Sequence, residues 1–134
     1  MSSTALPNPR RVITNFTFAA EDAARLEDTL GAGVLVRLPA GREALRSALA
    51  AHPEAEVVCS FSPPAETLEL APHVRWIALP SAGADHALRL GLIRPGGPIV
   101  TTANGIHAVP IAEFVLSVML QWSRQWPRLS LIHI

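Results

Sequence analysis

Residues 11–61 read RVITNFTFAAEDAARLEDTLGAGVLVRLPAGREALRSALAAHPEAEVVCSF, and the periodicity of this stretch decides the fold. Short runs rich in β-branched residues alternate with segments whose apolar side chains recur at helical spacing. The predicted strands are Arg11–Phe16, Val34–Leu38 and Glu56–Phe61, and the predicted helices are Ala19–Leu30, which Gly31 ends, and Arg42–Ala51. A strand that is followed regularly by a helix is typical of a parallel sheet, because parallel neighbours need a helix-length connection.

The same alternation continues to residue 102. A short helix is predicted at Ala65–Leu70, and further strands at Val74–Leu79 and Pro98–Thr102. The sequence therefore predicts an α/β fold: a flavodoxin-like parallel sheet of about five strands, flanked by helices.

The last helix differs from the others. It begins near Pro110 and reads PIAEFVLSVMLQWSRQW, with apolar side chains almost all round. Such a helix is normally buried on several sides, and the preceding sheet can cover only one of them. We therefore expect Trp122 and Trp126 to pack on a domain that follows, whereas Trp76 is expected to belong to the core of the sheet.

Composition and charge exclude several classes of protein. The 134 residues carry eleven acidic and eleven basic side chains, so no net field attracts nucleic acid or an anionic membrane surface. No apolar run reaches the length of about 18 residues that a membrane span needs, and residues 1–10 lack the apolar core of a signal peptide. These features favour a cytoplasmic protein whose partners include neither nucleic acid nor a membrane.

The reactive side chains do not form a metal site or a nucleophilic centre. Cys59 is the single cysteine, which excludes an internal disulfide, and on a strand it is expected to act as a small buried hydrophobic residue. His52, His73 and His86 have no spacing that would form a metal site with a carboxylate, and surface or capping roles are expected for them.

Ligands of open parallel sheets bind beyond the carboxyl ends of the strands. The loops that follow the predicted strands are therefore the first candidates for a site. They are Asn15–Phe18, Pro39–Gly41, Ser62–Pro64, Pro80–His86 and Ala103–Ala108.

Two segments carry a family resemblance: HVRWIALPSAGADHALRLGL at residues 73–92 and IVTTANGIHAVPIAEFVLSVML at residues 99–120. Together they resemble the D-isomer-specific 2-hydroxyacid dehydrogenases, whose Gly-x-Asp turn matches residues 83–85 and whose Ala-Glu pair matches residues 112–113. The resemblance implies a two-domain enzyme, homodimeric at full length, that uses NAD or NADP to interconvert small 2-hydroxy and 2-keto acids such as glyoxylate or hydroxypyruvate.

The resemblance also implies a division of the chain. Residues 1–107 would be the N-terminal part of the substrate domain, and residues 108–128 the linking helix that leads into a missing NAD-binding Rossmann domain. Residues 129–134, LSLIHI, are interpreted as a non-native tail, so that the sequence would be an N-terminal fragment.

Ala82 and Gly83 are the strongest candidates for substrate contact. Small residues let backbone N–H groups approach an anion closely, and the resemblance implies that the substrate carboxylate lies against this loop. The alternative is a tight strand-to-helix turn in which Gly83 adopts a positive φ and Asp85 caps the next helix.

Two further positions follow from the resemblance. His107 stands where many relatives have an asparagine near the substrate, and it could donate a hydrogen bond to a keto or carboxylate oxygen; alternatively it is a loop histidine that faces solvent or the cleft. Ile111 falls where relatives contact the cofactor, with a core position as the alternative. Glu113 is expected in the first helical turn, where the helix dipole favours a carboxylate, and not in catalysis.

The cofactor and catalytic machinery of the family has no counterpart here. The nearest match to a dinucleotide fingerprint, Gly31–Val36, ends with valine and precedes a strand, whereas the fingerprint must follow one. No residue corresponds to the family's catalytic arginine, glutamate and histidine. This polypeptide is therefore expected to be inactive and to bind neither NAD nor NADP tightly. The alternative is a stand-alone flavodoxin-like binding or oligomerisation module, in which the helix that begins near Pro110 is buried against the same helix of a second copy of the chain.

Overall fold

The structure is a computed structural model that describes residues 8–126 and 128. The chain divides into two compact units between Ala103 and Asn104, and each is described by itself. The predicted tail at residues 129–134 lies outside the described residues.

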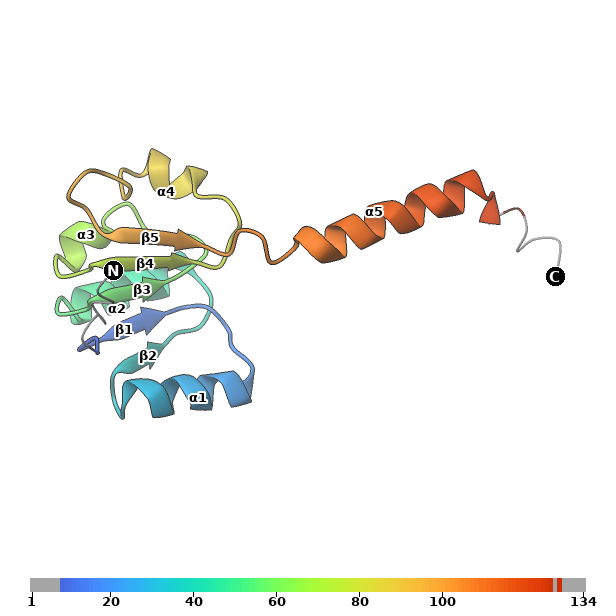
Figure 1. Cartoon of the computed structure of the whole chain (residues 1–134). Helices are drawn as coiled ribbons and strands as arrows, with labels where there is room; N and C mark the ends of the chain where they lie inside the picture. Colours follow the sequence, from blue (N-terminus) through green and yellow to red (C-terminus); the bar gives the residue numbers. More distant parts are fainter. Residues whose placement is uncertain (1–7, 127, 129–134) are drawn as a thin grey trace, which may run out of the picture. The chain divides into compact units, whose positions relative to one another are not determined.

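The first unit alternates strands and helices along the chain (Figure 1). Its elements are β1 (Val12–Thr14), α1 (Ala20–Leu30), β2 (Leu35–Arg37), α2 (Arg42–Ala51), β3 (Val57–Cys59), α3 (Thr67–Leu70), β4 (Trp76–Leu79), α4 (Asp85–Arg89) and β5 (Ile99–Thr102). The strands are shorter than predicted because only the residues that pair with a neighbour form the ladder; in β1, for example, Val12 to Thr14 pair with Val57 to Cys59.

The sheet confirms the predicted fold class. Its strand order is β2-β1-β3-β4-β5, and every neighbouring pair is parallel. The chain moves outward from β1 to β2 and then returns past β1 to β3, so the strand order reverses between β1 and β3. At such a point the loops that follow the two strands diverge and leave a crevice at the carboxyl edge.

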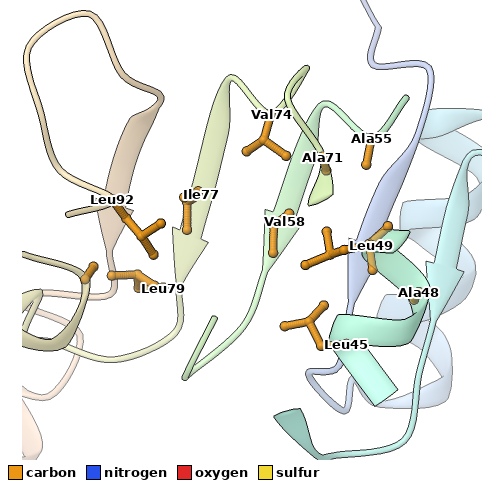
Figure 2. Packing of buried hydrophobic residues seen from close by; sticks show 12 residues of the cluster. Leu45, Ala48, Leu49, Ala55, Val58, Ala71, Val74, Ile77, Leu79 and Leu92 are labelled. Carbon is orange, nitrogen blue, oxygen red and sulfur yellow. The ribbon is translucent and has the colours of Figure 1, made fainter. Parts of the chain in front are cut away.

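One face of the sheet is closed. Ile13, Val58 and Ile77 project from three adjacent strands into a cluster that α2, α3 and α4 complete. Figure 2 shows Leu45 and Leu49 of α2 beside Val58 in this cluster. Each of these side chains is fully buried, so the hydrophobic effect stabilises this face at its three central strands.

The other face is only partly covered. It carries the alternate strand residues and the apolar side of α1, and between them lies a cavity of about 340 Å³. The cavity is lined by Pro9, Val12, Thr14, Phe18, Leu26, Leu30, Leu35, Val57, Cys59, Arg75, Trp76 and Ala78.

Trp76 corrects one prediction. It was expected in the core, but the residue is 38% exposed, and its indole N–H donates to the Thr101 hydroxyl at 2.9 Å. Trp76 precedes Ile77 on β4, so strand alternation places the two side chains on opposite faces. Ile77 reaches the closed face, whereas Trp76 reaches the face whose helix, α1, packs beside β2 at the far edge of the sheet.

The second unit contains α5 (Ala108–Ser123), which begins two residues before Pro110. The predicted apolar character is confirmed, and none of its sixteen residues is buried; Trp122 is 84% exposed. Glu113 is the sixth residue of α5, and the first turn contains no acidic residue, so the prediction that Glu113 lies in the first turn is wrong. The helix starts earlier because Ala108 and Val109 can take helical geometry ahead of Pro110, which tolerates a position in the first turn. Among the described residues, no helix has the length and apolarity required to cross a membrane.

Candidate functional site

The loops that follow β3, β4 and β5 are connected at the carboxyl edge of the sheet. The backbone N–H of Ser60 donates to the carbonyl of Ala78 at 3.1 Å, beyond the last residue of β3. The N–H of Ala103 donates to the carbonyls of Leu79 (3.1 Å) and Ser81 (2.9 Å). These bonds hold the start of the Ser81 loop between its two neighbours.

The loop between β4 and α4 contains Ala82 and Gly83, both exposed. The Ser81 hydroxyl donates to the Gly83 carbonyl at 2.9 Å and fixes the turn from within. Within residues 8–126 and 128, the backbone N–H groups of Ala82 and Gly83 donate to no protein group. Two consecutive exposed residues of this loop therefore have N–H groups without a partner among the described residues, an arrangement that suits an anion.

The alternative prediction for this loop is wrong in two respects. Gly83 does not have a positive φ, because the Ser81 hydroxyl closes the turn without a left-handed residue. Asp85 is the first residue of α4 and not its cap; the cap position belongs to Ala84, which makes no side-chain capping bond. An added Cβ on Gly83 would meet Asp85 Oδ2 at 3.6 Å, an ordinary contact, so the backbone here does not require glycine.

His107 and Ile111 belong to the second unit. His107 occupies the position before α5, is exposed, and accepts the Ile111 N–H on its carbonyl at 3.0 Å. Ile111 lies on α5 and is 59% exposed. The two side chains lie one helical turn apart.

Sequence reasoning named the loops after β1 and β3 but missed their aromatic residues. Phe16 contacts Phe18 edge-to-face, with ring centroids 4.9 Å apart, and also contacts Phe61, with centroids 5.4 Å apart. Phe16 and Phe18 lie in the predicted loop 15–18, and Phe61 immediately precedes the predicted loop 62–64. The positions of the three residues in the loops were therefore predictable, whereas the contact between Phe61 and Phe16 was found only in the tertiary structure.

Polar contacts connect the loops at the point where the strand order reverses. The Asn15 side-chain amide donates to the carbonyl of Gly41 at 3.0 Å, and Arg42 Nη2 donates to the Ser62 hydroxyl at 2.9 Å. The first bond joins the loops after β1 and β2, and the second joins the start of α2 to the loop after β3.

Cys59 and His86 occupy partly buried positions beside the sheet. Burial raises the pKa of the half-buried Cys59 thiol, and a hydrogen bond with Thr14 opposes this shift only in part. A raised pKa lowers the thiolate fraction, and the thiolate is the reactive form. His86 is partly buried, and its Nε2 is buried with no hydrogen-bond partner among the described residues, which corrects the surface or capping role predicted for it.

The Gly31–Val36 turn contains glycines but does not have the connectivity of a phosphate cradle. No three His, Cys, Asp or Glu side chains gather within residues 8–126 and 128. Gly31 ends α1 and, like Gly33, has a positive φ in the turn before β2. A phosphate cradle requires glycines after a strand and before a helix, so this turn has the wrong connectivity.

Comparisons with known proteins agree with the fold. No family model matches the sequence, and no curated protein matches it significantly. Among solved structures, the chain is similar to a D-isomer specific 2-hydroxyacid dehydrogenase family protein from Aeromonas salmonicida subsp. salmonicida A449, with 23% identity and a TM-score of 0.59. The match covers 88% of this chain and 37% of that protein. The likeness shows a shared fold, and the chain spans little more than a third of the length of its neighbour.

Proposed function

We propose that this chain forms the N-terminal part of the substrate domain of an oxidoreductase that interconverts D-2-hydroxy acids and 2-keto acids with NAD or NADP. The fold likeness and the resemblance of residues 73–120 support this proposal. The observation that carries it is the pair of exposed, unpaired N–H groups at Ala82 and Gly83, at the edge of the sheet where ligands of such folds bind.

In this proposal the substrate carboxylate accepts hydrogen bonds from Ala82 and Gly83. Hydrogen bonds from a backbone N–H to an ionised oxygen are stronger than those to a neutral one. Asp85 opposes the anion, because its carboxylate lies beside Gly83. His107 would donate to the keto or carboxylate oxygen, and Ile111 would contact the cofactor, as the family resemblance implies.

In this proposal the dinucleotide cradle and the family's catalytic arginine, glutamate and histidine lie outside this polypeptide. The proposal therefore assigns this polypeptide substrate contact without turnover, and assigns NAD or NADP binding to another domain. The complete enzyme would be a cytoplasmic homodimer. Rapid NAD(P)H consumption by this polypeptide with glyoxylate or hydroxypyruvate would contradict this part of the proposal.

Amide NMR of the ¹⁵N-labelled chain during titration with pyruvate tests the carboxylate site. We expect the largest shifts at Ala82 and Gly83, and none with pyruvamide, which lacks the carboxylate. Ser81→Ala removes the hydroxyl that shapes the loop and should weaken binding. Ser117→Ala is the matched control, because its hydroxyl also donates to a nearby backbone carbonyl, that of Phe114, but on α5.

Asp85→Asn sharpens the test because it should strengthen pyruvate binding by removing a like charge. Equal shifts with pyruvate and pyruvamide, or shifts confined to other loops, would overturn the carboxylate site.

A second candidate function is self-association through α5. The observation that favours it is the exposure of nearly every apolar side chain of this helix, including Phe114 and Leu120. Exposed apolar patches of this extent mark interaction surfaces. Light scattering should then detect a defined oligomer that Phe114→Glu dissociates, whereas Ser117→Glu, which adds the same charge at a polar position, should have a smaller effect. A monomer at all concentrations would exclude this function.

A further inference from the structure

Three phenylalanines form a continuous cluster at the point where the strand order reverses. Phe18 lines the cavity beside α1, Phe16 contacts Phe18 edge-to-face, and Phe61 contacts Phe16. Phe61 is 54% exposed at the end of this series. The cluster therefore extends from the apolar interior to the carboxyl edge and presents part of an aromatic ring there.

Hydrogen bonds on both sides of Phe61 fix its position. The N–H of Ser62 donates to the hydroxyl of Ser60, which is fully buried, at 3.1 Å. The Ser62 hydroxyl in turn accepts from Arg42 at 2.9 Å. Because the backbone is held before any ligand arrives, a ligand that packs on the ring has little ordering left to impose on the loop.

The Phe61 loop and the Ser81 loop leave adjacent strands at the same level. Cys59 of β3 pairs with Ala78 of β4, and the next bond joins the Ser60 N–H to the Ala78 carbonyl. Neighbouring strands lie about 4.8 Å apart. A small ligand whose carboxylate meets the N–H groups of Ala82 and Gly83 therefore has an aromatic surface one strand away.

We infer that the Phe16–Phe18–Phe61 cluster receives the side chain of the substrate and selects 2-keto acids with an aromatic or bulky apolar substituent. This inference rests on the proposed function, because the Ser81 loop must hold the carboxylate. An offset or edge-to-face ring contact and the burial of apolar surface both favour such a substituent, whereas the methyl group of pyruvate gains little from either.

A comparison of two ligands by amide NMR tests the inference. The 134-residue chain is titrated with phenylpyruvate and with pyruvate, and the shifts of the Ala82 and Gly83 amides are followed. We expect phenylpyruvate to bind about tenfold more tightly. Phe61→Ala should reduce this preference to about twofold or less, because phenylpyruvate loses its ring contact. Phe61→Trp should restore the preference. Phe114→Ala removes an exposed ring from α5 and serves as the control.

The outcomes separate the inference from the proposed function. If both keto acids shift Ala82 and Gly83 with equal affinity, or if the preference survives both Phe61→Ala and Phe16→Ala, the cluster is not the selective element and the carboxylate site stands. If neither keto acid shifts these amides, the proposed function fails and the inference fails with it. Amide spectra of the free variants, recorded first, show that each one is folded.

Discussion

The two faces of the sheet differ although the same strands supply both. On β4, Ile77 is fully buried beneath the helices of the closed face, whereas its neighbour Trp76 is 38% exposed on the face that α1 covers in part. Both side chains are apolar and both lie on an interior strand. The difference shows that helix placement, and not the hydrophobicity of a residue, decides whether a strand position belongs to the core.

The largest expected effect is that of Ile77→Ala. The substitution leaves a cavity in the closed face and should lower the free energy of unfolding by about 2–5 kcal/mol. Urea denaturation measures this loss, with the exposed Leu88→Ala as the control, which should change stability by less than about 0.5 kcal/mol. A small loss at Ile77 would mean that the closed face is loosely packed.

Trp76→Ala should have a smaller effect, about 1–2 kcal/mol, although it removes a larger side chain. Part of the ring is already in contact with water, and the bond to Thr101 is replaced by hydration of the freed hydroxyl. The same denaturation experiment compares it directly with Ile77→Ala. A loss equal to that of Ile77→Ala would show that another element covers this face in solution.

Cys59 reports on the same face through its reactivity. The thiol lines the cavity beside α1, so a small alkylating reagent should reach it in the folded protein. Because burial raises its pKa, the reaction should be slower than that of a small free thiol at pH 7 and should accelerate in alkaline solution. Mass spectrometry follows the labelling, and labelling that occurs only in urea would contradict an accessible face.

The smallest effect is expected at the amino edge, outside both faces. Hydrogen bonds from a backbone N–H, His52 and Arg11 lower the pKa of the partly exposed Glu54. A lowered folded-state pKa stabilises the fold above the unfolded-state pKa, and this stabilisation is lost as the pH falls through the folded-state value. Glu54→Gln should therefore flatten the acid limb of the stability profile slightly, and urea denaturation at several pH values measures this change.

The positions of the helices and strands along the chain were easier to predict from the sequence than the contacts that these elements make. Helix α2 was predicted with its observed bounds, because Leu45 and Leu49 recur at helical spacing within an alanine-rich segment. The ends of the strands were missed, since a strand ends where its partner stops pairing. The backbone conformation of Gly83 was also missed. The Ser81 hydroxyl closes this turn by a hydrogen bond to the Gly83 carbonyl, and no local sequence pattern predicts that bond.

The candidate site was predictable only where it depends on local sequence. Ala82 and Gly83 lie in a loop that the strand pattern places at the carboxyl edge, and their small side chains suggest close approach by a ligand. Phe61 carried no such signal, since a phenylalanine at the end of a strand is usually a core residue. Its ring contacts that of Phe16, which is 45 positions earlier in the sequence.

By itself, the sequence determined that this chain alternates strands and helices and builds a parallel sheet, because hydrophobic period and chain connectivity are local properties. The tertiary structure alone decided which face of each strand is covered, which loops meet at the carboxyl edge, and that Phe61 is left partly exposed there. Those features depend on strand order and on the positions of helices far away in the chain, and no short window of sequence contains either.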